Sequence, residues 1–365
     1  MLQKTYGTTG KKVSVIGFGG MRFANPDDID ANARIVLHAY RRGINYFDTA
    51  PAYCNDRSEE IIGAAVRQMD RAGIFVATKC MESDGARLRE SLERSLKRLN
   101  VDCIDFFHIW CLLTLEGWKE RKTAGAVAAA QKAKEEGLIS HLVVSAHLNG
   151  PDLRGVLEEG VFEGATLGYC AVNFPYRQEA IDAAGAMGLG IVTMNPLGGG
   201  LIPKHAKRFD FIRSPKDASV TAAALRFNVS QPAITSALVG FTTIQQVDEA
   251  VAAVENFQPY DAAHITAMRK KILENFEGLC TGCGYCLPCP VGINIPRMMD
   301  AYNYAMLQGK PQSVLGRLRW HWGLSPADAK ACSLCGTCEE RCTQHLPIRD
   351  RLKEIAAIPT EKPKD

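Results

Sequence analysis

The chain has 365 residues, of which 46% are hydrophobic and 23% are charged, as in a globular protein with ample core. Its net charge of +3 at pH 7 gives no reason to expect a nucleic-acid partner. No stretch approaches the roughly 20 apolar residues of a membrane helix, and the N-terminal residues lack the apolar segment of a signal peptide, so we expect a cytoplasmic protein without membrane contacts.

The first element that the sequence predicts is a short hairpin. Residues 5–14 read TYGTTGKKVS, in which Gly7 and Gly10 suit the backbone of a turn. We expect this hairpin to cover the floor of the domain that follows.

Eight short segments rich in β-branched and aromatic residues come next, and each precedes a longer segment with helical periodicity. The expected strands are 13–19, 45–50, 74–79, 103–109, 141–146, 166–172, 191–195 and 235–240. The expected helices are 28–42, 58–71, 86–99, 117–136, 152–159, 178–187, 218–228 and 244–254. Eight strand-helix units predict an α/β fold in which parallel strands close into a (β/α)8 TIM barrel over residues 1–256. A doubly wound open sheet is the main alternative.

Beyond residue 256 the alternation stops, and we expect a second, helical and ferredoxin-like domain over residues 257–365. Thirteen cysteines in a chain without a secretion signal favour metal binding or thiol chemistry, because the cytosol keeps thiols reduced. Five of them are scattered among apolar residues, where we expect buried side chains without a functional role: Cys54, Cys80, Cys103, Cys111 and Cys170.

The other eight cysteines form two runs that resemble the cluster loops of ferredoxins. The first run is Cys280, Cys283, Cys286 and Cys289, and the second is Cys332, Cys335, Cys338 and Cys342. The resemblance implies two [4Fe-4S] clusters. In two-cluster ferredoxins the fourth cysteine of each run binds the other cluster, which pairs Cys342 with the first triplet and Cys289 with the second. A pair of zinc sites is the alternative, although zinc loops usually consist of separated cysteine pairs.

Four barrel segments resemble the aldo-keto reductase family. Residues 45–63 read NYFDTAPAYCNDRSEEIIG, and VSVIGFGGMR, FVATK and MNPLGGG stand at the family's positions at 13–22, 75–79 and 194–200. The resemblance covers roughly residues 1–255. It implies a barrel that binds a nicotinamide cofactor at the C-terminal strand ends, with Tyr53 as the carbonyl-reducing group and Lys79 and Asp48 beside it.

The chemistry of these three residues agrees with that role. Reduction of a carbonyl by hydride needs a proton donor at the developing alkoxide, and a phenol with a pKa of about 10 must be acidified to serve. We expect Lys79 to favour the phenolate of Tyr53, and Asp48 to keep Lys79 charged and oriented. The alternative is a structural ion pair and an unrelated surface tyrosine.

The family's cofactor contacts carry over to positions near the strand ends, where glycines let backbone N–H groups reach a pyrophosphate. The residues so implied are Gly19, Gly20, Met21, Ser145, Asn173, Pro196, Leu197, Gly198, Gly240, Gln246 and Glu249. Thr242 stands where a basic residue usually meets the 2′-phosphate of NADP, so the choice between NADH and NADPH is open.

One family feature is missing from the sequence. Trp110 stands where the family carries a histidine at the end of the fourth strand, and His108 lies two residues earlier. Because strand side chains alternate, both would face the same side. His108 could substitute for the missing histidine, but we favour the interpretation that it is a core residue.

These observations lead to three functional hypotheses. The first is an oxidoreductase that transfers hydride between NAD(P)H and a small carbonyl or alcohol, with clusters that pass electrons to a redox partner protein. A hydride carries two electrons and a cubane accepts one, and we find no motif for a flavin that would convert between them. The second hypothesis therefore gives the clusters a structural role. The third is a non-catalytic or electron-transfer module that uses the barrel as a scaffold.

Overall fold

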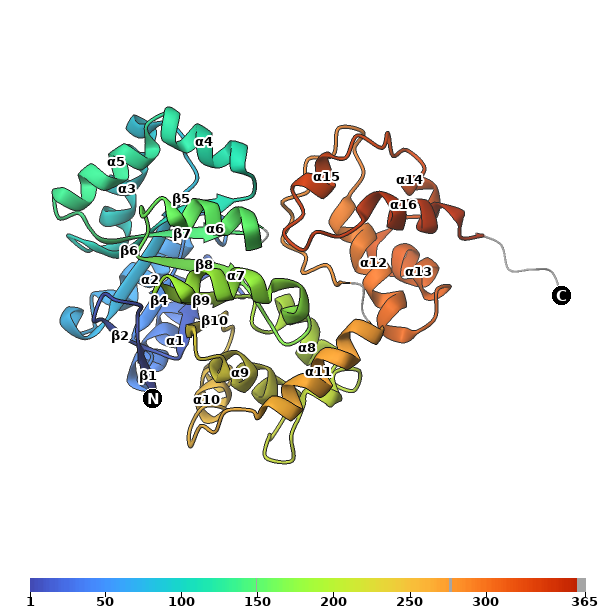
Figure 1. The fold of residues 1–365 in the computed structure, drawn as a ribbon, viewed down its shortest axis with the longest axis horizontal. Coiled ribbons are helices and arrows are strands. Elements are labelled where there is room, and N and C mark those ends of the chain that lie inside the picture. The colour runs from blue at the N-terminus through green and yellow to red at the C-terminus, as the bar shows by residue number, and fades with distance from the viewer. Residues whose placement is uncertain (149, 276–277, 360–365) are drawn as a thin grey trace.

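The computed structural model describes residues 1–148, 150–275 and 278–359, and its larger part is a closed parallel barrel of eight strands (Figure 1). The strands are β3 (Ile16–Gly19), β4 (Tyr46–Asp48), β5 (Phe75–Cys80), β6 (Ile104–Leu112), β7 (Ile139–Ala146), β8 (Gly164–Gly168), β9 (Gly190–Met194) and β10 (Ile234–Val239). All eight expected strands are present, and closure between β10 and β3 excludes the open sheet.

Helices cover the outside of the barrel. They are α1 (Ile29–Arg41), α2 (Ser58–Val66), α3 (Gly85–Leu99), α4 (Leu115–Thr123), α5 (Ala126–Glu135), α6 (Gly150–Glu158), α7 (Phe174–Ala186), α8 (Leu201–Lys204), α9 (Val220–Ser230) and α10 (Ile244–Ala252). The single helix expected over 117–136 is wrong, because the chain breaks there into α4 and α5. Gly125 lies between them with φ of 93°, a left-handed conformation that ends one helix and begins the next.

The N-terminal hairpin closes the barrel floor, as predicted. Strand β1 (Gln3–Thr5) pairs antiparallel with β2 (Lys12–Ser14), and the Tyr6 side chain between them is fully buried. Its ring lies 4.3 Å from that of Phe106, measured between centroids. A Cβ built on Gly190 would come within 2.0 Å of the Tyr6 ring, so only glycine at position 190 leaves room for the Tyr6 side chain.

Gly190→Ala should therefore destabilise the barrel. Overpacking of a buried site typically costs about 1–3 kcal/mol of unfolding free energy. Gly155→Ala is the matched control, because Gly155 is exposed on α6 with open space around its Cβ position, and alanine should slightly raise stability there. Denaturant unfolding monitored by circular dichroism measures both. Equal stability of the Gly190→Ala variant and the wild type would contradict the close packing of the Tyr6 ring against residue 190.

The C-terminal part is helical. It contains α11 (Ala262–Asn275), α12 (Ile295–Gln308), α13 (Ser313–Gly316), α14 (Pro326–Ala329), α15 (Thr337–Glu340) and α16 (Ile348–Ala357). A separate hydrophobic core joins α12 to α16 and includes Met298 and Leu352. Helix α11 packs on the barrel, since Met268 and Ile272 belong to the barrel's core. The division of the chain at residue 256 stays a prediction.

The C-terminal part lies beside the carboxyl ends of the barrel strands, which we call the barrel mouth (Figure 1). Asn173, between β8 and α7, donates to Gln344 at 3.1 Å. The backbone oxygen of His147, after β7, hydrogen bonds with the His345 ring at 3.2 Å. Across the described ranges, no helix is both long enough and apolar enough to cross a membrane.

Candidate functional site

Asp48, Lys79 and Tyr53 meet at the barrel mouth. Asp48 ends β4 and Lys79 lies on β5, and both side chains are buried. The Lys79 ammonium donates to Asp48 Oδ1 at 2.5 Å and to the backbone oxygen of Thr49 at 2.8 Å. Tyr53 lies in the loop after β4, with its ring centroid 5.5 Å from Lys79 Nζ. The structure thus brings together the three residues that the sequence singled out.

The cation that acts to lower the pKa of the Tyr53 hydroxyl is not the expected Lys79. Burial raises the pKa of Tyr53 well above the usual value, and the carboxylate of Asp48 acts in the same direction, whereas Arg22 lowers it. Burial also raises the pKa of Asp48 and lowers that of Lys79, while their ion pair opposes both shifts. The sequence pointed to Lys79 as the cation that acidifies the phenol, and it gave no signal for Arg22.

Lys79→Met should destabilise the protein by about 3–5 kcal/mol, because it leaves the buried carboxylate of Asp48 without its partner. The double variant Asp48→Leu/Lys79→Met removes both charges and should regain much of that loss. Urea unfolding of the two variants tests the difference. If the single variant is as stable as the double variant, the pair is not a coupled buried ion pair.

His108 is a core residue, as favoured from the sequence. It is fully buried inside the barrel, where its ring hydrogen bonds with the backbone oxygen of Thr78 at 3.1 Å and with the Thr166 hydroxyl at 2.9 Å. Burial and the charge of Lys79 keep its pKa well below the usual range. With both ring nitrogens engaged, His108 does not take the place of the missing histidine.

A bulge near the end of β6 turns two neighbouring side chains into the mouth. The pairing of β6 with β7 shifts register between Ile109 and Leu112, and Cys111 has φ of 58°. Trp110 and Cys111 therefore belong to one cluster with Tyr53 and with Tyr285 of the C-terminal part. The Trp110 ring meets the Tyr53 ring edge to face, with centroids 5.4 Å apart. The sequence gave no sign that Cys111 would face this site.

The residues implied as cofactor contacts all lie at the mouth end of the barrel, on strand ends, the loops after them and α10. They are Gly19, Gly20, Met21, Ser145, Asn173, Pro196, Leu197, Gly198, Gly240, Gln246 and Glu249. Several have protein partners in this structure: Asn173 bonds with Gln344, Gln246 accepts from Thr242, and Glu249 accepts from Gln245. Their role in cofactor binding stays a prediction.

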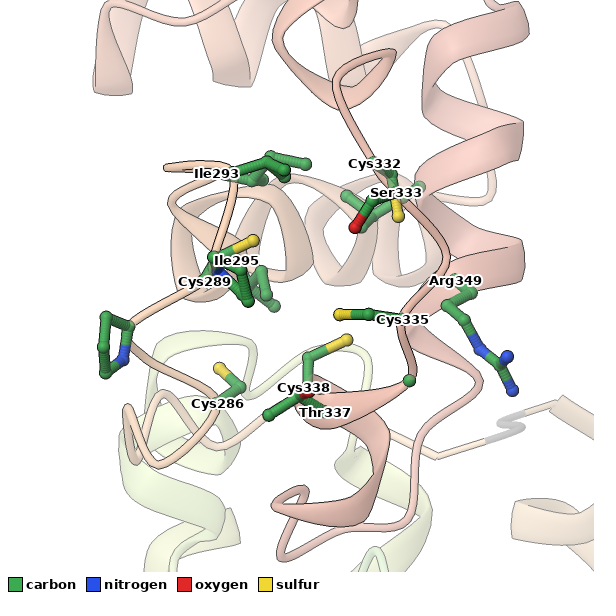
Figure 2. Close-up of a pocket in the computed structure, with 15 residues that line it drawn as sticks. Cys286, Cys289, Ile293, Ile295, Cys332, Ser333, Cys335, Thr337, Cys338 and Arg349 are labelled. Atoms are coloured by element: carbon green, nitrogen blue, oxygen red, sulfur yellow. The ribbon is translucent and has the colours of Figure 1, made fainter.

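The eight C-terminal cysteines line two neighbouring pockets. We call Cys280, Cys283, Cys286 and Cys342 the proximal set, and Cys289, Cys332, Cys335 and Cys338 the distal set. One pocket is lined by all four proximal cysteines, and the other by all four distal cysteines together with Cys286. Figure 2 shows the second pocket, with Cys289 on one side and Cys332, Cys335 and Cys338 opposite. This grouping follows the crossed pairing implied by the ferredoxin resemblance.

Within the described ranges, no three His, Cys, Asp or Glu side chains are arranged to hold one metal ion.

A buried cation from the barrel faces the proximal set. Arg177 on α7 is buried, and its charge interacts with Cys342. Its Nη1 lies 3.4 Å from the backbone oxygen of His147, and its Nη2 is buried without a hydrogen-bond partner among the described groups. A buried guanidinium needs a counter-charge, and a thiolate-bound cluster would supply one.

Comparison with known proteins agrees with both halves of the chain. Residues 15–272 match the family model described as "Aldo/keto reductase family", and residues 279–347 match the one described as "4Fe-4S dicluster domain". An L-galactose dehydrogenase of Arabidopsis thaliana is 30% identical over 287 residues, covering 70% of this chain and 88% of the relative. An NADH-specific methylglyoxal reductase of Escherichia coli is 25% identical, covering 73% of this chain and 98% of the relative.

A solved structure shows the same barrel. The aldo-keto reductase AKR11C1 from Bacillus halodurans superposes with a TM-score of 0.65 and is 24% identical, covering 74% of this chain and 96% of that one. The family match spans most of the chain, and the site residues expected from the family motifs converge at the barrel mouth. The chain is therefore an oxidoreductase that belongs to the aldo/keto reductase family and carries a 4Fe-4S dicluster domain.

Proposed function

We propose that the barrel interconverts a small carbonyl compound and its alcohol with NADH or NADPH, and that Tyr53 is the proton donor. The observation that carries this proposal is the convergence of Tyr53, Lys79 and Asp48 at the mouth. A bound nicotinamide would supply the hydride to the carbonyl carbon. The Tyr53 hydroxyl gives its proton to the carbonyl oxygen, and the positive charge of Arg22 favours the phenolate that remains, with the Lys79 ammonium 5.5 Å from the ring centroid.

The loop after β9 fits a dinucleotide. Gly198, Gly199 and Gly200 all have positive φ, and open space surrounds the Cβ position of Gly200, so a phosphate can approach the backbone closely there. Met21, after β3, is exposed at the same end of the barrel. These features support binding of a nicotinamide dinucleotide by the residues implied from the family.

The relatives suggest the class of substrate. One is named for L-galactose and another for methylglyoxal, which are a sugar and a 2-oxoaldehyde. We extend this to a small polar aldehyde, ketone or sugar for the present chain.

Nucleotide titration and turnover assays test the proposed activity. Anaerobically purified protein is titrated with NADH and with NADPH, followed by nucleotide fluorescence, and is then assayed with methylglyoxal, aldoses and simple aldehydes. We expect binding of at least one nucleotide and turnover of at least one carbonyl. Failure to bind either nucleotide would overturn the proposal.

We further propose that the proximal and distal sets each bind one [4Fe-4S] cluster. The grouping of the cysteines around two pockets and the buried charge of Arg177 support this. Eight irons per chain and a broad absorbance near roughly 400 nm that dithionite bleaches are the expected signatures.

An electron relay is a second candidate function, favoured by the positions of the two sets. Cys335 of the distal set is exposed, and Leu287, Val291 and Leu334 around that set expose their apolar side chains, as a docking face for a redox partner protein would. The proximal set lies between this face and the barrel mouth, since Cys283 is close enough to Cys111 to affect its pKa. Anaerobic addition of NADH or NADPH separates the alternatives. Bleaching of the clusters supports a relay, and unchanged clusters during carbonyl turnover support a structural role.

Arg177→Leu should lower the reduction potential of the proximal cluster. Removal of a buried positive charge disfavours the more negative, reduced state of a nearby centre. Redox titration followed by electron paramagnetic resonance measures the potential, and the distal cluster serves as an internal control. An unchanged proximal potential would show that Arg177 is not the counter-charge of this cluster.

A further inference from the structure

Tyr285 is the residue of the C-terminal part that reaches into the reductase site. It lies between Cys283 and Cys286 in the first cysteine run, yet its ring clusters with Trp110, Cys111 and the partly buried Tyr53. Its ring centroid is 5.5 Å from that of His147, on the neighbouring strand end. The loop that contains Cys283 and Cys286 therefore carries a phenol across the interface between the barrel and the C-terminal part, which we call the seam.

The Tyr285 hydroxyl lies near Trp110 and Cys111. Burial raises the pKa of Tyr285, the nearby Cys111 raises it further, and Trp110 lowers it. Sulfur is a weak hydrogen-bond acceptor, so a carbonyl oxygen brought to the site would be a better partner for this hydroxyl than the Cys111 thiol. Tyr285 is also close enough to Tyr53 to act on it electrostatically.

His108 is not free to act as the second donor, because both of its ring nitrogens are hydrogen bonded inside the barrel. Carbonyl reduction gains from a second donor, because negative charge develops on the oxygen as hydride adds to the carbon. The position of the missing histidine is filled by Trp110, whose side chain packs in one cluster with Tyr285.

We propose that Tyr285, supplied by the iron-sulfur domain, donates a second hydrogen bond to the substrate's carbonyl oxygen beside Tyr53. The inference rests on the proposed carbonyl activity. It makes the iron-sulfur domain a part of the substrate site, and it makes Trp110 a positioning residue for Tyr285.

Binding of an unreactive carbonyl tests the proposal without relying on turnover. Isobutyramide presents a carbonyl oxygen but is not reduced, and its Kd for the holoprotein with NADH or NADPH bound is measured by quenching of nucleotide fluorescence. Tyr285→Phe keeps the ring and should weaken isobutyramide binding by about tenfold, the order expected for one hydrogen bond. Cys111→Ala removes the thiol that lies near the Tyr285 hydroxyl and should leave isobutyramide binding unchanged or strengthen it.

The controls keep the outcome interpretable. Tyr302→Phe removes a hydroxyl in the same domain that bonds with Glu354, away from the site, and should bind isobutyramide as the wild type does. Iron content and visible absorbance confirm that each variant holds its clusters. Wild-type affinity in Tyr285→Phe, or no isobutyramide binding in the wild type, overturns the assignment.

Turnover distinguishes this proposal from the proposed function. With a carbonyl that the wild type reduces, Tyr285→Phe should lower kcat more than it raises KM, because the second donor acts most strongly on the developing charge. Absence of turnover in the wild type would count against the proposed function. Wild-type kinetics in Tyr285→Phe would count against the role of Tyr285 alone.

Discussion

Replacement of Tyr53 by phenylalanine should lower kcat for carbonyl reduction by about 10²- to 10⁴-fold, the usual contribution of a general acid. The change removes the only proton that the proposed mechanism places on the carbonyl oxygen, and it leaves the ring against Trp110. Nucleotide affinity should change little, because the proposed cofactor contacts lie on other loops. Steady-state kinetics and nucleotide titration of the same preparation measure both quantities.

The substitution of a second tyrosine, Tyr40, serves as the control for Tyr53→Phe. Tyr40 lies on the outer helix α1, where its hydroxyl accepts from the backbone of Asp70 at 3.4 Å. Tyr40→Phe makes the same chemical change away from the mouth and should retain wild-type kcat. If Tyr53→Phe reduces carbonyls as fast as Tyr40→Phe, another group supplies the proton and the assignment of Tyr53 is wrong.

The second prediction with a large expected effect tests whether the fourth cysteine of each run binds the cluster of the other run. Cys289→Ala should remove the distal cluster and spare the proximal one, although Cys289 lies only three residues after Cys286 in the sequence. Cys342→Ala should do the opposite. Each variant should retain about four irons per chain, and the electron paramagnetic resonance spectrum of the reduced protein should show which cluster remains.

Arg177 identifies the remaining cluster. Because Arg177 interacts with Cys342, only the signal of the proximal cluster should shift when Arg177→Leu is added to Cys289→Ala. A spectrum of Cys289→Ala that keeps the distal signal and loses the proximal one would show that each run binds its own cluster. Loss of both clusters would show that the domain requires all eight ligands to fold, and spectra of Cys289→Ser would then be needed to assign the signals.

The strand-helix alternation was sufficient to predict the barrel, because it depends on local periodicity. The crossed division of the cysteines into two sets came from the resemblance to ferredoxins and stays a prediction. The convergence of Asp48 and Lys79 was predictable from the order of strand ends in a parallel barrel. The break at Gly125 was not, since glycine within a helical pattern is often tolerated.

The contacts across the seam could not be predicted. Tyr285, Arg177 and Gln344 meet partners more than 100 residues away, and no periodicity links such positions. Tyr285 also lies inside a cysteine run, where the motif assigns a role to the cysteines and none to the residues between them. Arg22 affects Tyr53 only because the loop after β3 folds over the mouth, where the Arg22 side chain packs on Gly240.

The contact between the C-terminal part and the barrel mouth should also make the substrate site depend on the iron supply of the cell. The floor is closed by Tyr6, so the barrel is covered at both ends by Tyr6 and the C-terminal part, and the loop that carries Tyr285 also carries cysteines that we propose as cluster ligands. If the clusters shape this loop as proposed, we expect a chain made under iron starvation to have a folded barrel with an incomplete substrate site. Limited proteolysis of protein expressed without iron should cleave within 280–289 and leave the barrel intact, whereas equal resistance with and without iron would show that docking does not depend on the metal.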